Sequence, residues 1–129
     1  MADLNALIRQ PTESELAFFK KNSHVGGMAT EDDRVILNPY TTLNAVERDA
    51  VALNESARVI MRKSGTRPRF ELTPEQIKRL KGTPYENNVQ AARETIAARI
   101  LSGDPSAGTP TPDQKLFVDQ LAKIMFNNP

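Results

Sequence analysis

Apolar side chains recur at helical spacing through most of this chain. Between residues 43 and 63 they fall at intervals of three and four and form one narrow stripe flanked by charged residues. The same periodicity continues over 74–81, 84–102 and 112–126. The pattern predicts an all-α protein whose longest helix spans 43–63 and begins after Asn44, a residue suited to cap it.

Three copies of the sequence Thr-Pro-x-(Glu/Gln) precede helical stretches. Threonine at the N-cap accepts a hydrogen bond from the third helical residue, and the Glu or Gln side chain accepts one from the threonine N–H. Proline at the first helical position loses no hydrogen bond, because that N–H has no helical partner. The three copies therefore predict helix starts at 73–76, 83–86 and 111–114.

The first residues predict two short helical pieces. A Thr-Glu-Ser-Glu capping box at 12–15 predicts a helix that ends near Lys21, where cations suit the helix dipole. The piece at 1–10 is amphipathic, because three apolar residues share one helical face: Leu4, Leu7 and Ile8.

Residues 22–42 break the helical pattern. They contain Gly26-Gly27, an acidic run at 31–33 and a turn signal at Asn38-Pro39, and only 34–37 has the character of a strand. A connection of this length with little regular structure is uncommon inside a compact domain. We therefore expect an arm or strap that lies on a surface.

The last helix follows a stretch rich in Gly, Pro and Ser, which has the composition of a linker. The expected organisation is an N-terminal arm over 1–42, a helical core over 43–102, a linker over 103–111 and a C-terminal helix over 112–129. The fold class we predict is a small helical domain of about four helices, with an extended N-terminal arm and a flexibly linked C-terminal helix.

Composition narrows the chemistry that the chain can perform. It has no cysteine, so disulfides, thiol nucleophiles and cysteine-ligated metal sites are excluded. The one histidine, His24, has no neighbouring ligand or nucleophile, and no phosphate-binding loop, dinucleotide fingerprint or nucleophile elbow is present. No run is apolar enough to suggest a membrane span. We therefore expect a non-enzymatic protein with no catalytic residue, cofactor or metal.

Positive charge is concentrated in one part of the chain. The net charge is +1, but residues 58–81 hold eight basic residues against two acidic ones. Such a stretch can neutralise phosphates, although half of these cations also suit helix C-termini. A small nucleic-acid-binding or regulatory protein is thus the alternative function, with these candidate contacts: Arg62, Lys63, Arg67, Arg69 and Lys78.

The apolar stripes at 4–8 and 112–126 are the candidate partner contacts. Short helices beside flexible flanks are marginal in water, and such helices act as anchors in the groove of a partner protein. The alternative is that they fold back on the protein's own core. The candidate residues are Leu4, Leu7, Ile8, Phe117, Leu121, Ile124 and Met125.

Taken together, the chain resembles small virion proteins of tailed bacteriophages, such as adaptors and connector-associated proteins. The shared features are the lack of cysteine, the helices that follow Thr-Pro, the alanine-rich face at 91–98 and the strap at 22–42. The resemblance implies a structural protein that forms a homo-oligomer or binds a multimeric ring or shell. It implies a location in the virion if the chain is phage-encoded, and in the cytoplasm otherwise.

Overall fold

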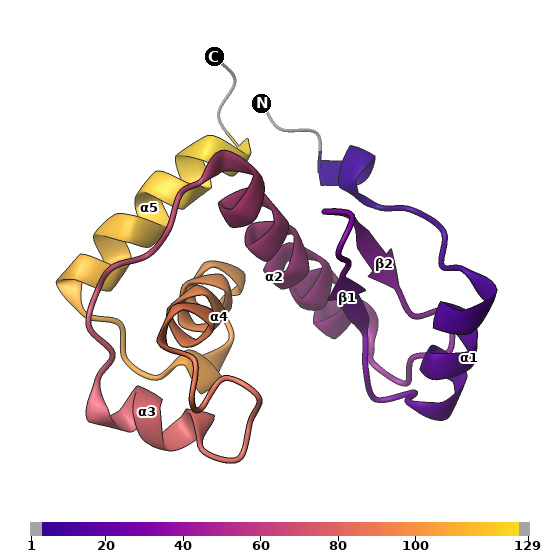
Figure 1. Cartoon of the computed structure of the whole chain (residues 1–129), viewed down its shortest axis with the longest axis horizontal. Helices are drawn as coiled ribbons and strands as arrows, with labels where there is room; N and C mark the ends of the chain where they lie inside the picture. The colour runs from indigo at the N-terminus through magenta and orange to yellow at the C-terminus, as the bar shows by residue number, and fades with distance from the viewer. Residues whose placement is uncertain (1–3, 127–129) are drawn as a thin grey trace.

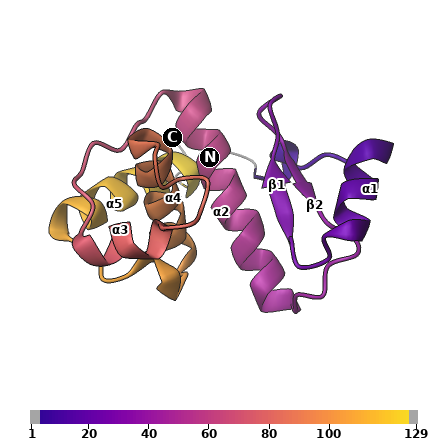
Figure 2. The same ribbon diagram turned by 60° about the horizontal axis from the view of Figure 1, so that its bottom comes forward.

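A computed structural model describes residues 4–126, with side chains from residue 6 onward. The long helix α2 lies in the middle, with a strand pair and α1 on one side and α3, α4 and α5 on the other (Figures 1 and 2). The elements of the described residues are, in chain order, η1 (Leu4–Leu7), α1 (Glu13–Lys21), β1 (Gly27–Ala29), β2 (Val35–Leu37), α2 (Ala45–Ser64), α3 (Pro74–Leu80), α4 (Val89–Ser102), η2 (Pro105–Ala107) and α5 (Pro112–Phe126).

The mostly helical character is confirmed, and two details of the predicted fold class are corrected. The described residues form five α-helices rather than about four. They also contain a two-stranded antiparallel sheet in which Met28 pairs with Ile36. The sequence does not predict this sheet, because only residues 34–37 have strand character. The partner strand contains two weak strand formers, Gly27 and Ala29.

Four helix starts have the predicted capping geometry. Thr12, Asn44, Thr73 and Thr111 each accept a hydrogen bond from the third helical residue, whose own side chain accepts the N–H of the cap. α2 ends at Gly65, which has a φ of 69°. Glycine adopts this left-handed conformation without the strain of a Cβ, so the predicted helix end is confirmed as well.

The second Thr-Pro sequence does not begin a helix. α4 starts at Val89, with Asn88 as its N-cap. Thr83 directly follows α3, and its hydroxyl donates to the carbonyl of Leu80 at the C-terminal end of that helix. The N–H of Thr83 also donates to Leu80, and Glu86 accepts the N–H of Gly82 instead of that of Thr83, so the reciprocal cap does not form. Residues 81–87 form turns, and the predicted earlier start of α4 is wrong.

The predicted strap is a hairpin held by a buried asparagine. The side-chain amide of Asn38 donates to the carbonyls of Phe19 at 3.3 Å and Val25 at 2.7 Å, which joins the end of α1 to the hairpin. The hairpin also approaches α2 closely. A Cβ at Gly26 would lie 2.7 Å from the Leu43 side chain and 3.1 Å from the Val51 side chain, so a larger residue there would need these side chains to shift.

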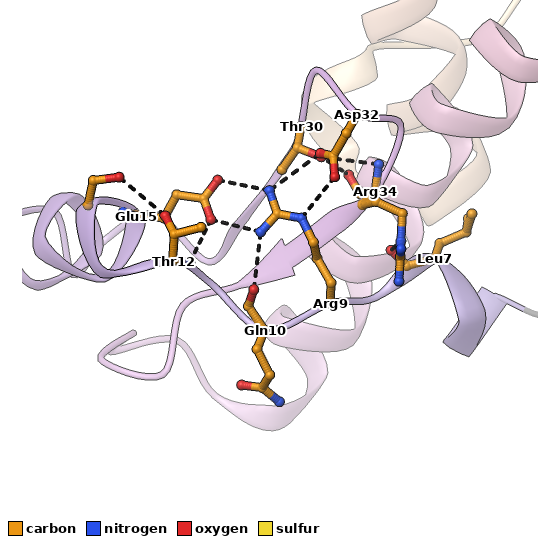
Figure 3. A network of polar contacts seen from close by, with 9 residues as sticks. Leu7, Arg9, Gln10, Thr12, Glu15, Thr30, Asp32 and Arg34 are labelled. Carbon is orange, nitrogen blue, oxygen red and sulfur yellow. Dashed lines mark hydrogen bonds and ion pairs between the residues drawn. The ribbon is translucent and has the colours of Figure 1, made fainter.

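A polar network anchored on Arg9 ties the start of the chain to the hairpin turn (Figure 3). The Arg9 guanidinium donates to the two carboxylate oxygens of Glu15 at 2.8 and 3.0 Å, and to Asp32 at 3.2 Å. Arg34 donates from the same turn to the carbonyl of Leu7. The segment 7–15 is thus held against the hairpin by charge-assisted hydrogen bonds, which are among the stronger kinds.

The core lies where α2, α4 and α5 meet. The residues of α2 over 56–61 are buried on several sides of the helix, because the hairpin and α4 pack on different faces of it. Val46, expected on its apolar stripe, is 78% exposed. Small residues of α4 permit the close approach to α2. The buried apolar residues of these three helices include Ala57, Ile60, Met61, Ala92, Ile96, Ala97, Ala98, Val118, Leu121 and Met125.

A reciprocal glutamine pair joins the first turns of α3 and α5. The amides of Gln76 and Gln114 are fully buried and exchange two hydrogen bonds of 2.8 Å each. Each glutamine is also the third helical residue of its Thr-Pro sequence, and it accepts the N–H of Thr73 or Thr111. The linker is held as well, because the N–H of Thr109 donates to Glu75. The expected flexible linkage of the C-terminal helix is therefore wrong.

Candidate functional site

Most of the apolar residues expected to contact partners belong to the fold itself. Three are buried in the core: Leu7, Leu121 and Met125. Two are half-buried: Ile8 and Phe117. Ile124 is 42% exposed on α5, and the side chain of Leu4 lies outside the described part of the chain. These stripes thus fold back on the core, as the alternative interpretation held.

The basic candidates are more accessible. Arg62 forms an ion pair with Asp33, with a nitrogen–oxygen distance of 3.7 Å. Residues 66–70 form no helix or strand, and exposed Arg67 and Arg69 alternate there with buried Pro68 and Phe70. The other four candidates are exposed and form no ion pair among the described residues: Lys63, Arg67, Arg69 and Lys78.

Three hollows on the described surface share one residue, Tyr85. The first, of about 410 Å³, lies between β1, α2 and α4. The second, of about 560 Å³, lies between α2 and the C-terminal end of α4. The third, of about 320 Å³, lies between α3 and α4. Because Tyr85 belongs to the turns at 81–87, its ring lies at the junction of these hollows rather than along a helix.

Arg58 is held in a fixed position against Tyr85. Its guanidinium carbon lies 5.3 Å from the centroid of the ring, the geometry of a cation–π contact. The guanidinium also donates to Thr95 on α4 at 2.9 Å and to Asn54 on α2 at 3.1 Å. Arg58 and Tyr85 both line the first and the second hollow, so their stack forms a wall between these two hollows.

Glu55 is the buried charge of this region. Its carboxylate accepts the N–H of Ala29 at 3.0 Å and lies 3.8 Å from Arg58. Burial raises the pKa of Glu55 above its ordinary value of 4.5, and the charge of Arg58, the hydrogen bond from Ala29 and the charge of Arg62 oppose the rise. The carboxylate therefore ties β1 to α2 at the cost of a partly dehydrated charge.

The third hollow is the most apolar surface of the site, and we name it the α3–α4 groove. Ile77 and Val89 lie along it and are 51% and 61% exposed. Arg93 lines it from α4. Its other lining residues are Glu71, Leu72, Leu80, Lys81, Tyr85, Glu86 and Ala92. An aromatic ring beside exposed aliphatic side chains is a combination that binds other molecules by contact.

The periodicity over 84–102 predicts one helix with Tyr85 and Val89 on its apolar face, and this prediction misses their place in a surface site. The signal that identifies the true helix start is Asn88, a good N-cap residue directly before an apolar-periodic run. With the helix started there, Tyr85 falls in a turn. The contact of Arg58 with Tyr85 depends on the same turn, so no local pattern predicts it.

Comparison of the chain with protein-family models, curated proteins and solved structures finds no match. Among the described residues, no group of three or more His, Cys, Asp or Glu side chains is placed to hold a metal ion. None of the helices in 4–126 is both long and apolar enough to cross a membrane. The function of this chain must therefore be inferred from the geometry of its described surface.

Proposed function

We propose that this protein is a non-enzymatic assembly protein that docks on larger partners, or on copies of itself, through the surface around Tyr85. The observation that carries the proposal is that Ile77 and Val89, 51% and 61% exposed, line one apolar groove. Single exposed hydrophobic residues are ordinary on protein surfaces. Two that share a hollow with an aromatic ring form a patch, and such patches mark interaction sites.

The stack of Arg58 and Tyr85 supports a docking role. Tyrosine and arginine are enriched among the residues that contribute most to binding energy at interfaces. Arg58 is already fixed by hydrogen bonds to Thr95 and Asn54. A partner that covers it loses less side-chain entropy than one that must order a free arginine.

The setting we propose is the particle of a tailed bacteriophage, with this protein as a minor virion component. The support is the resemblance in composition and pattern: no cysteine, helices that follow Thr-Pro sequences and an alanine-rich helix. In that setting the partner is a multimeric ring or shell, or further copies of the chain. A cytoplasmic assembly is the setting if the chain is not phage-encoded.

The test compares co-purification and self-association of three forms in the native host. The double variant Ile77→Asp/Val89→Asp places two carboxylates in the groove, where they cannot be dehydrated cheaply by a partner. Leu116→Asp is the matched control, because Leu116 is 60% exposed on α5 and does not line the groove. Circular dichroism checks that all forms fold.

We expect wild type and the control to associate with the same partner, or with themselves, in sedimentation and mass spectrometry. The double variant should lose that association. A wild-type protein that stays monomeric at all concentrations and co-purifies with nothing would contradict the proposal.

A second candidate function is nucleic-acid binding, which the exposed Arg67 and Arg69 favour. They alternate with buried Pro68 and Phe70 in a segment without helix or strand and form no ion pair among the described residues. Two such cations contacting phosphates would give binding that weakens with salt. The test measures DNA binding at two salt concentrations, with and without Arg67→Ala/Arg69→Ala. Absence of salt-dependent binding by wild type would exclude this function.

A further inference from the structure

Residues 83–88 lie one hydrogen-bond step from a helix. The carbonyl of Thr83 accepts the N–H of Glu86 at 3.2 Å, and the carbonyl of Tyr85 accepts the N–H of Asn88 at 3.3 Å. Each bond joins residues three positions apart, the spacing of a 3₁₀ turn, whereas an α-helix joins residues four apart. The hydroxyl of Thr83 also accepts the N–H of Tyr85 at 3.3 Å, as an N-cap side chain does with the second helical residue. The segment directly precedes α4 and has the form of its unfinished first turns.

The Thr-Pro sequence at 83–86 has two competing hydrogen-bond arrangements. In the other two copies of this sequence, the side chain of the third helical residue accepts the N–H of the threonine. Glu86 instead accepts the N–H of Gly82 at 3.1 Å, and the N–H of Thr83 donates to Leu80 at the end of α3. The N–H groups of Gly82 and Thr83 are on adjacent residues, so a shift of Glu86 from the first to the second completes its half of the cap. Thr83 therefore serves either the end of α3 or the start of α4.

The ring of Tyr85 favours the turns over the helix. It lies over the guanidinium of Arg58, 5.3 Å from carbon to centroid, and hydrogen bonds to α2 and α4 fix that guanidinium. In a longer α4, Tyr85 would share a helix face with Val89 and Ala92, which lie four and seven positions further on. Val89 and Ala92 line the α3–α4 groove and neither of the other two hollows, whereas Arg58 lines only those two. The longer helix thus requires the ring to leave Arg58 and to lose the cation–π contact.

We propose that residues 83–88 are a conformational switch between these turns and an extension of α4 that begins at Pro84. The contact of Tyr85 with Arg58 holds the switch in the turns, and Thr83 is the N-cap of the extended helix. Because Tyr85 lines all three hollows, the switch changes the surface that a partner meets. A partner that covers Arg58 takes the place of the ring and favours the extension. This regulation rests on the docking function proposed above, whereas the switch itself is a property of the free chain.

The experiment records backbone NMR spectra of the full chain as wild type, Tyr85→Val and Tyr85→Phe. Valine removes the ring and has nearly the same intrinsic helix propensity as tyrosine, so propensity does not account for a longer helix. Phenylalanine is the matched control, because it keeps a ring over Arg58. Cα chemical shifts report helix over 84–88, and hydrogen exchange reports whether the amides of Asn87 and Asn88 gain helical hydrogen bonds.

We expect Tyr85→Val to move the Cα shifts of 84–88 to helical values and to slow exchange at Asn87 and Asn88 at least roughly tenfold. Tyr85→Phe should match wild type. Unchanged shifts in Tyr85→Val, or the same helix extension in Tyr85→Phe, would overturn the inference. If Tyr85→Val does not fold, relaxation dispersion of wild type decides: exchange of 83–88 with a state of helical shifts is expected, and its absence would overturn the switch. The chain is free of partners in these measurements, so their failure is distinct from failure of the docking function, which has its own test.

Discussion

The Gln76–Gln114 pair predicts that α3 and α5 stabilise each other. The two amides exchange two hydrogen bonds of 2.8 Å in a fully buried position. Gln76 also accepts the N–H of Thr73 at 2.9 Å, which completes the cap of α3. Gln76→Ala removes all three hydrogen bonds, so at about 1 kcal/mol each it should lower the free energy of unfolding by about 3 kcal/mol. The space left by the side chain adds to this cost.

A double-mutant cycle isolates the contact between the two helices. Gln76→Ala and Gln114→Ala share two of the hydrogen bonds that they remove, so the double variant should lose less than the sum of the two. The expected interaction energy is about 2 kcal/mol, from two bonds of about 1 kcal/mol each. Urea denaturation followed by circular dichroism gives the four free energies of unfolding.

A matched control separates this coupling from a general effect of deleting buried polar groups. Asn38→Ala removes a buried amide that bonds to Phe19 and Val25, on the opposite side of α2. Paired with Gln114→Ala, it should show additive losses within about 0.5 kcal/mol. An interaction energy near zero for the glutamine pair would refute the reasoning, because α5 would then be independent of α3.

Three further predictions concern pH and the backbone. Burial raises the pKa of Glu55 above 4.5, so the folded protein holds the proton of this carboxyl more tightly than the unfolded chain does. The free energy of unfolding therefore falls as pH rises through the window above 4.5. Glu55→Gln should flatten that slope in denaturation measured from pH 4.5 to 7, and an unchanged slope would exclude the assignment. The hydrogen bonds of Arg9, and then that of the Thr12 N–H, lower the pKa of Glu15 to about 2. Its stabilisation is thus present above about pH 4.5 and lost as pH falls toward 2, so wild type and Arg9→Met should converge in stability in acid; a constant difference would count against the network. Gly65→Ala, at a φ of 69° with open space around it, should cost about 1 kcal/mol in urea denaturation, and no loss would contradict the left-handed cap.

The features that could be predicted from the sequence depend on residues close together in the chain. Thr12, Asn44 and Thr73 cap helices through bonds that reach only three residues. Thr83 has the same local sequence but a different outcome, because its N–H donates to Leu80 at the end of α3 and Glu86 accepts the N–H of Gly82 instead. The local motif therefore predicts a cap only where a preceding helix does not already bind the N–H of the cap residue.

The candidate site could not be predicted, because it depends on contacts between distant segments. The glutamine pair of the fold shows the same limit, because Gln76 and Gln114 are 38 positions apart and no local pattern predicts that their amides meet. Arg58 reaches Thr95 across 37 positions. The position of Tyr85 depends on the turn that Thr83 makes. The exposure of Arg67 and Arg69 could be predicted from their charge alone, since charged side chains lie at the surface in most folds.

Site-specific photo-crosslinking from the α3–α4 groove tests the docking claim most directly. A photoreactive benzophenone amino acid replaces Val89, 61% exposed in the groove, or Arg48, exposed on α2 outside the three hollows. After irradiation in the native host, the account predicts a discrete covalent adduct with one partner, or with a second copy of the chain, from position 89 alone. No adduct from position 89, or the same adducts from both positions, would contradict it.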